Sequence, residues 1–270
     1  MSNKTLPKIG LGTYSDSNRS QWTEVVSKAL ELGYRHIDTA RDYKNQRYVG
    51  NGIANADVPR EDVFLSTKVV HIDTPGKSYD EVVAAAEECL DRLGTNYVDL
   101  LYIHWPIGVY DAESTLRAFE DLYDEGKVMN IGLSNFTIEL LEEARGILSV
   151  PILAHQFELH PLLYQEQLLD HAHRHDYHVV AYSPLGQGSV FDIPELSSIA
   201  VKHGVSEAQV SLAWLLNKEN VHVIPKTVSK ERLQQNLEAV NLELDREDIE
   251  KIDNIDKRER IIDFENAPWN

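Results

Sequence analysis

The sequence predicts an α/β protein, in which eight parallel strands and their connecting helices close into a (β/α)8 TIM barrel with an extra C-terminal helix and tail. Short apolar segments alternate along the chain with amphipathic segments of helical length, a pattern typical of a parallel sheet. The apolar segments are continuous runs, which indicates strands buried on both faces. The chain has 270 residues, close to the length of about 250 that is typical of such barrels. An open, doubly wound sheet is the alternative.

Eight apolar segments are the predicted strands. They cover residues 9–12, 36–37, 63–66, 98–103, 130–133, 152–157, 178–182 and 221–224. The clearest predicted helices cover residues 22–32, 78–93, 114–123, 206–216, 230–240 and 246–255, before a tail of residues 261–270. No Pro/Ser-rich linker and no repeat beyond the βα unit interrupts the pattern, so we expect one domain over residues 1–270.

The glycine pattern disfavours a Rossmann domain. A dinucleotide-binding Rossmann unit carries Gly-x-Gly-x-x-Gly between its first strand and first helix. Gly10 and Gly12 have no third glycine at that spacing, and no other segment supplies the pattern. We therefore expect no Rossmann domain.

Composition limits the partners and the compartment. The net charge of −18 at pH 7 would repel phosphate backbones, so we expect no nucleic-acid partner. No apolar run is long enough to span a membrane, and we see no secretory signal, so we expect a cytoplasmic protein. The single cysteine, Cys89, fits a reducing compartment and a place in the core. A high-salt origin and an ordinary acidic protein both explain the charge.

Polar side chains stand at the end of every predicted strand. In a barrel of this kind, function collects at the carboxyl ends of the strands. These residues are Thr13, Asp38, Lys68, His104, Ser134, Asn135, Gln156, Tyr182, Ser183 and Lys226. A complete ring of such residues predicts an active site at that end.

Four residues form a coherent set for carbonyl chemistry. Lys68 follows an apolar run, so its ammonium needs an anion, and Asp38 is the natural partner. A free tyrosine has a pKa of about 10, and we expect the ammonium to lower the pKa of Tyr43 so that it can protonate a carbonyl oxygen. A neutral His104 could orient the same oxygen. No side chain carries hydride, so such a reaction requires a cofactor.

Five motifs between residue 6 and about residue 236 resemble those of the aldo-keto reductases, the short prokaryotic type similar to diketogluconate reductases. They are Gly33-Tyr34-Arg35-His36-Ile37-Asp38-Thr39-Ala40 with Tyr43 and Asn45, Ser66-Thr67-Lys68, Ile103-His104-Trp105-Pro106, Gly132-Leu133-Ser134-Asn135-Phe136 and Ile224-Pro225-Lys226-Thr227. The resemblance implies NADP(H)-dependent reduction of aldehydes or ketones to alcohols. It also implies a catalytic tetrad of Asp38, Tyr43, Lys68 and His104, with Tyr43 as the proton donor.

The resemblance further implies that NADP(H) lies extended across the barrel mouth. Ser134, Asn135 and Gln156 would bind the nicotinamide carboxamide, Tyr182 would stack on its ring, and Lys226, Thr227 and Arg232 would bind the 2′-phosphate. The full set of implied cofactor contacts is Thr13, Ser134, Asn135, Gln156, Tyr182, Ser183, Leu185, Gly186, Lys226, Thr227, Arg232, Gln235 and Asn236. Three residues depart from the family pattern, namely Gln46, His155 and Gln235.

The substrate side is less well defined. Tyr14, Trp105 and the tail could form an apolar mouth for small aldehydes or compact ketones, with Trp269 either lining the mouth or pinning the tail. Related short reductases are often monomers, so we expect a monomer whose partner is a small carbonyl compound.

Two alternatives remain. A metal site is suggested by three nearby histidines, His171, His173 and His175. Only His171 and His175 share a helix face, and they lie away from the strand ends, so we expect no metal. A cofactor-binding redox sensor or interaction subunit on the same fold is the alternative function.

Overall fold

A computed structural model describes residues 4–14, 18–71 and 78–270. Eight strands form one parallel sheet in sequence order. They are β1 (Leu11–Gly12), β2 (His36–Asp38), β3 (Phe64–Val69), β4 (Leu100–Ile103), β5 (Ile131–Ser134), β6 (Ile152–Glu158), β7 (His178–Tyr182) and β8 (Val221–Val223).

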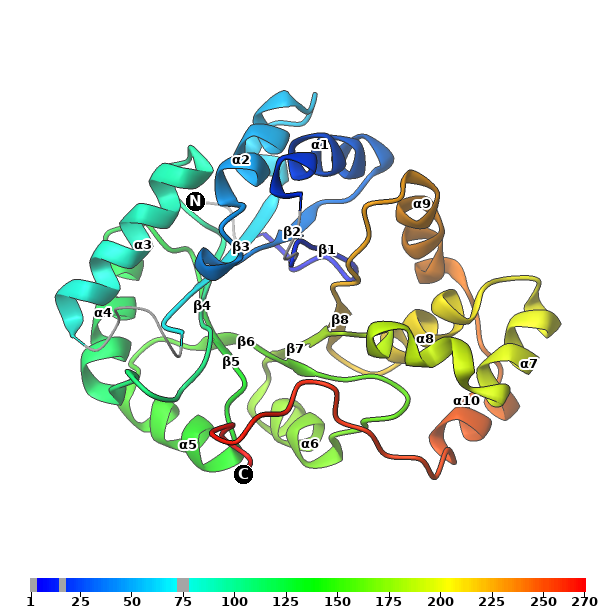
Figure 1. The fold of residues 1–270 in the computed structure, drawn as a ribbon. Coiled ribbons are helices and arrows are strands. Elements are labelled where there is room, and N and C mark those ends of the chain that lie inside the picture. Colours follow the sequence, from blue (N-terminus) through cyan, green and yellow to red (C-terminus); the bar gives the residue numbers. More distant parts are fainter. Residues whose placement is uncertain (1–3, 15–17, 72–77) are drawn as a thin grey trace.

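The sheet closes on itself. Ile9, just before β1, forms a parallel bridge with Val223 of β8, and the Gly10 amide donates to the Val223 carbonyl at 2.8 Å. Figure 1 shows the strands at the centre, with the helices around them. The predicted barrel is confirmed, and the open sheet is excluded.

Ten α-helices are found in the described chain. They are α1 (Trp22–Leu32), α2 (Gln46–Asn55), α3 (Tyr79–Leu93), α4 (Ala112–Asp124), α5 (Ile138–Ile147), α6 (Glu166–His175), α7 (Pro194–His203), α8 (Glu207–Leu216), α9 (Lys230–Glu238) and α10 (Arg246–Asp253). None of the described helices is both long and apolar enough to cross a bilayer.

The local sequence explains where several helices begin and end. Ser78 and Glu81 form a capping box at the start of α3, and Ser206 and Gln209 form one at the start of α8. These pairs satisfy backbone amides that have no partner within the helix. Gly94 ends α3 in the left-handed conformation (φ 67°) that glycine adopts at little cost.

Two layers of packing fix the direction of the strand side chains. Leu65 and Leu101 belong to the large cluster between sheet and helices, whereas Phe64, Leu100 and Tyr102 belong to a smaller cluster. Because successive strand residues point to opposite faces, the smaller cluster fills the barrel. The same alternation points the even-numbered residues of β2 and β3 inward.

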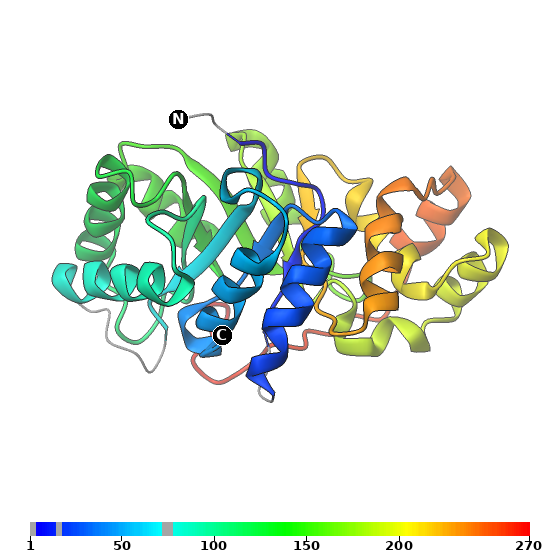
Figure 2. The same ribbon diagram turned by 90° about the horizontal axis from the view of Figure 1, so that it is seen from above.

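The C-terminal tail lies at the carboxyl end of the barrel. Figure 1 shows it passing from α10 toward α5, and Figure 2 shows it at the opposite end of the barrel from the first described residues. Buried Glu158, at the end of β6, accepts the amides of Ile261 at 2.7 Å and Ile262 at 2.9 Å. The tail is therefore fixed beside the residues at the strand ends.

Candidate active site

A buried ion pair lies near the carboxyl ends of β2 and β3. Lys68 of β3 hydrogen-bonds to Asp38 of β2 and donates to the Thr39 carbonyl at 3.0 Å. The other carboxylate oxygen of Asp38 accepts from Ser66 Oγ at 2.8 Å and from Gln156 Nε2 at 3.1 Å. Asp38 and Lys68 are each only 1% exposed. Both charges are compensated, as burial of an ion pair requires.

Tyr43 lies against this pair on the one-turn helix that follows β2. Lys68 Nζ lies 5.3 Å from the centre of the Tyr43 ring, and the ring centres of Tyr43 and His104 are 5.9 Å apart. Tyr14 meets the Tyr43 ring edge-on at 5.2 Å. The structure thus brings all four predicted catalytic residues together.

Asn45 fixes the segment that carries Tyr43. Its Nδ2 donates to the Thr13 carbonyl at 2.7 Å, and its Oδ1 accepts from Thr39 Oγ1 at 3.1 Å. Thr13 is fully buried, and its Oγ1 donates to the Asp38 carbonyl at 3.0 Å. Here Thr13 holds β1 against β2.

The charge states differ in part from the sequence prediction. Burial, with the Asp38 charge as a further cause, raises the pKa of Tyr43 well above its ordinary value, so the predicted net lowering of that pKa is wrong. Burial lowers the pKa of the Lys68 ammonium, and Asp38 opposes that effect. Burial, the Lys68 charge and His71 hold the pKa of His104 well below its usual range. At neutral pH Tyr43 keeps its proton and His104 is uncharged, as expected of the histidine.

The predicted nicotinamide residues form a hydrogen-bonded group along one side of the mouth. Asn135 donates to the His104 carbonyl at 3.0 Å and to Ser134 Oγ at 3.1 Å. The half-buried Tyr182 donates to Asn135 Oδ1 at 2.8 Å. Gln156 is bonded to Asp38. Amide, hydroxyl and aromatic groups therefore lie next to the ion pair.

The loop after β7 has an unusual backbone. Ser183 (φ 46°), Gly186 (φ 53°), Gln187 (φ 51°) and Gly188 (φ 110°) all adopt positive φ. Such conformations are costly for serine and glutamine, and they concentrate at functional sites. This loop, which includes half-buried Leu185, lies at the carboxyl end of the barrel.

A group of cations lies in the segment after β8 and in the first turn of α9. Lys226, Lys230 and Arg232 are exposed, and no described carboxylate lies within 4.0 Å of their charged groups. In a protein with 44 acidic and 26 basic residues, three neighbouring cations without a described carboxylate partner favour an anion-binding site. Gln235 is half-buried and Asn236 is buried on the same helix.

The same segment also contains an ordinary helix cap. Ser229 Oγ accepts the Arg232 amide at 3.4 Å, and Thr227 Oγ1 accepts the Ser229 amide at 3.1 Å. These contacts use the Arg232 backbone and leave its guanidinium available to a ligand.

Aromatic residues surround the mouth. The Tyr14 side chain is 53% exposed beside Tyr43. Trp105 packs against Phe264 and Trp269 of the tail, with ring centres 5.0 and 5.8 Å apart. The Arg260 guanidinium lies 4.1 Å from the centre of the Trp269 ring. Trp269 therefore pins the tail against Trp105, whose ring centre lies 6.3 Å from that of His104.

The roles of several residues at the site were not predicted from the sequence. Ser66 holds the second oxygen of Asp38, and Glu158 anchors the tail. His71 lies with its ring centre 5.1 Å from that of His104. The only signal for His71 was its position three residues after Lys68, and nothing indicated the partner of Glu158.

Comparisons with known proteins agree with this geometry. A profile of the Aldo/keto reductase family matches residues 8–257. The glyoxal reductase of Bacillus subtilis (strain 168) is 41% identical over 256 residues, covering 95% of this chain and 91% of that protein. The methylglyoxal reductase DkgB of Escherichia coli O157:H7 is 37% identical over 260 residues, covering 95% of this chain and 96% of that protein.

Solved structures extend the likeness to three dimensions. The structure of a putative 2,5-diketo-D-gluconic acid reductase B has a TM-score of 0.92 at 34% identity, covering 97% of this chain and 92% of the other. A Bombyx mori aldo-keto reductase in complex with NADP has a TM-score of 0.88 at 31% identity, covering 96% of this chain and 92% of the other. The chain belongs to the aldo/keto reductase family of oxidoreductases.

Proposed function

We propose that this protein reduces small aldehydes and compact ketones to alcohols, with NADPH as the hydride donor and Tyr43 as the general acid. The observation that carries the proposal is the buried Asp38–Lys68 pair beneath Tyr43 and beside His104. This arrangement provides a proton donor and a fixed positive charge at one point of the barrel mouth.

The residues at the mouth fit a nicotinamide dinucleotide. Asn135 and Gln156 offer amides for a carboxamide, and the half-buried Tyr182 offers a ring for stacking. Lys226 and Arg232 supply cations with no described carboxylate partner. When bound, NADPH would supply the hydride that no side chain can carry.

The chain's own residues would handle the proton. Tyr43 keeps its proton at neutral pH, and it would donate that proton to the carbonyl oxygen as negative charge develops there. Because the developing alkoxide is a stronger base than a phenolate, the transfer remains favourable despite the raised pKa. The Lys68 ammonium stabilises the resulting phenolate, Asp38 keeps that ammonium charged and in place, and neutral His104 orients the carbonyl oxygen.

The substrate class follows from the mouth and from the relatives. Tyr14 packs against Tyr43 and Trp105 lies beside His104, which suits compact and partly apolar carbonyl compounds. Two relatives are named for the reduction of glyoxal and of methylglyoxal. We infer that small aldehydes of this kind are substrates.

NADPH should be preferred over NADH. Only NADPH carries the 2′-phosphate that Lys226 and Arg232 could bind. Hydrogen bonds to charged groups contribute about 1.5–3 kcal/mol each, so two of them correspond to a preference of roughly 10²–10⁴ in kcat/KM. Steady-state rates with each cofactor give that ratio directly, and equal values would contradict the proposed phosphate site.

The Tyr43→Phe variant tests the mechanism. Removal of the phenol hydroxyl should lower kcat with methylglyoxal and NADPH by about 10²–10⁴-fold, the usual contribution of general acid catalysis. Binding of NADPH, followed by the change in its fluorescence, should be nearly unchanged. Tyr164→Phe is the matched control, because Tyr164 packs against Trp214 outside the barrel mouth.

Three outcomes are informative. A large loss of kcat in Tyr43→Phe alone supports the proposal. Full activity of Tyr43→Phe would exclude Tyr43 as the acid. If the wild-type protein binds NADPH but turns over none of a panel of aldehydes, the cofactor-sensing alternative is favoured.

A further inference from the structure

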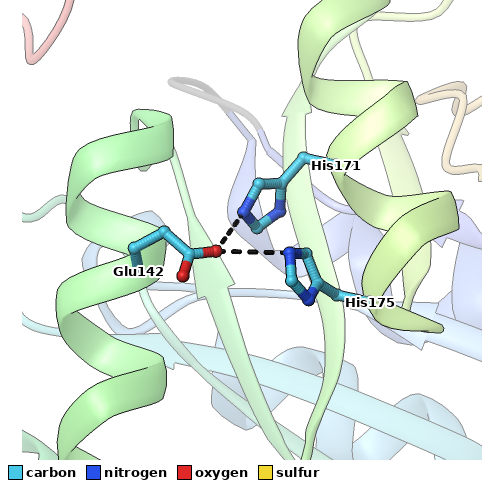
Figure 3. Close-up of side chains that lie close together, drawn as sticks. All are labelled: Glu142, His171 and His175. Atoms are coloured by element: carbon cyan, nitrogen blue, oxygen red, sulfur yellow. Dashed lines mark hydrogen bonds and ion pairs between the residues drawn. The ribbon is translucent and has the colours of Figure 1, made fainter.

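Two neighbouring helices bring together three potential metal ligands on the outside of the barrel. His171 and His175 lie one turn apart on α6, and Glu142 faces them from α5 (Figure 3). His171 Nε2 lies 2.6 Å and His175 Nε2 lies 3.3 Å from the same oxygen of Glu142. From these three residues we infer a binding site for a divalent transition metal ion, with zinc as the best-suited ion.

The positions of the ligand atoms fit such an ion. All three lie within 4.8 Å of one another. Zinc binds nitrogen and oxygen ligands at about 2.0–2.2 Å in tetrahedral geometry, which places ligand atoms about 3.3 Å apart. Small side-chain rotations of Glu142 and His175 would therefore suffice. Two imidazoles and one carboxylate are a ligand set that zinc uses in proteins.

The histidine nearest the core is already oriented. His171 is 1% exposed, and its Nδ1 lies 2.8 Å from the hydroxyl of buried Tyr177. A ring nitrogen held by a polar partner is the arrangement that fixes a metal-binding histidine. The neutral imidazole of His171 would coordinate the ion through Nε2 in the tautomer that carries its one proton on Nδ1, and Nδ1–H would donate to the Tyr177 oxygen.

The other side of the site is open. The Glu142 side chain is 52% exposed and that of His175 is 25% exposed. An ion bound here would therefore have three protein ligands and solvent in its fourth position. Arg145 disfavours binding of a metal cation, since its Nε lies 3.6 Å from the same Glu142 oxygen. It is three residues from Glu142 on α5 and exposed, so it can turn away.

The position of the site suggests a structural role. His175 is the last residue of α6, and β7 begins three residues later at His178. The site therefore lies toward the end of the barrel where strands begin, opposite the end that holds Tyr43. The ion would link α5 to α6 and take no part in the reduction.

Sequence alone could not supply the third ligand. Glu142 is 29 residues from His171, and the expectation of no metal considered only the histidines of one helix. The packing of α5 beside α6 places Glu142 in the set (Figure 3).

Titration of the chelator-treated protein with zinc and with cobalt(II) tests the inference. We expect one equivalent of zinc to bind in calorimetry and a tetrahedral cobalt absorption band to appear at the same stoichiometry. His175→Gln and Glu142→Gln should each weaken zinc binding at least tenfold. His173→Gln is the matched control, because His173 lies on the same helix, is 68% exposed and contacts Glu219 instead.

The possible results separate clearly. The inference is supported if the affinity falls in His175→Gln and Glu142→Gln but not in His173→Gln. It is overturned if wild type and His175→Gln bind zinc equally, if His173→Gln loses as much affinity, or if wild type shows no saturable binding. Thermal unfolding with zinc provides an independent measure, since an ion that binds only the folded state raises the unfolding temperature of wild type.

Discussion

The ionisable residues of the mouth depend on one another. Asp38 is the counter-ion that keeps the buried Lys68 charged, and Ser66 and Gln156 complete the hydrogen bonds of Asp38. Removal of one partner from such a pair leaves an uncompensated buried charge, which is strongly destabilising.

Asp38→Asn should therefore reduce both stability and activity. We expect a loss of about 3–5 kcal/mol in the free energy of unfolding at pH 7, measured by urea denaturation. The pKa of Lys68 in the folded protein is already below its unfolded value, and the variant lowers it further. The unfolded state then binds more protons, so the deficit should shrink as pH rises toward the unfolded pKa of about 10.4.

A double variant separates the two effects. Asp38→Asn with Lys68→Met contains neither buried charge, so it should regain much of the stability lost by Asp38→Asn. It should stay inactive, because no ammonium remains near Tyr43. If the double variant is as unstable as the single one, the unpaired charge is not the cause.

For single residues, the sequence predicted which four side chains form the tetrad. It did not predict the pKa values and hydrogen bonds that their surroundings give them. Asp38, Lys68 and His104 stand at strand ends in a parallel barrel, and that position alone predicts their convergence. The pKa of Tyr43 is raised by burial and by the Asp38 charge, and only the packed structure reveals both. Contacts such as Glu158 with Ile261 join residues 103 positions apart, and no local pattern encodes them.

Whether a segment forms a helix or a strand was easier to predict from the sequence than the residues at which that element begins and ends. The strand expected at residues 9–12 pairs regularly only over Leu11–Gly12, and the one expected at residues 98–103 begins at Leu100. Hydrophobic runs mark buried strands but do not specify where hydrogen bonding to the neighbour begins. The sequence also does not show where two helices pack closely. The glycines that allow such packing can be recognised only from the atoms around them in the structure.

Gly50 is such a contact. A methyl group at Gly50 of α2 would lie 2.2 Å from the Leu93 carbonyl oxygen at the end of α3, a backbone atom that cannot move alone. Gly50→Ala should cost about 1–3 kcal/mol in the free energy of unfolding, measured by urea denaturation. It should also lower activity, since α2 directly follows Asn45, which holds the Tyr43 segment.

The control is another helical glycine. Gly146 of α5 is exposed, and a methyl group there would meet no atom within 4 Å. Gly146→Ala should therefore be neutral or stabilise the protein by up to about 1 kcal/mol. Equal destabilisation by the two substitutions would show that close packing of α2 on α3 is not responsible.

For the whole molecule, two charge effects oppose each other as pH falls. Protonation of carboxylates reduces the self-repulsion of a chain with net charge −18, which favours the compact state. Buried neutral histidines act in the other direction. Burial lowers the pKa of His36 to about 4 and those of His155 and His222 to about 3.

These histidines should control acid unfolding. Each has a folded pKa below the unfolded value of about 6.5, so the unfolded state binds more protons. Their contribution is complete above pH 6.5 and is lost as pH falls from there toward 3–4. Each should add a slope of up to about 1.4 kcal/mol per pH unit between pH 6 and 4.

His155→Asn isolates one of these contributions. His155 Nε2 accepts the Phe136 amide at 3.2 Å, so protonation of Nε2 breaks that bond inside the core, whereas asparagine has no titrating group. The slope of unfolding free energy between pH 6 and 4, from urea denaturation at several pH values, should fall by about 1.4 kcal/mol per pH unit. His173→Asn, at an exposed position, should leave the slope unchanged. An unaltered slope in His155→Asn would mean that surface carboxylates, rather than buried imidazoles, set the acid limit of this fold.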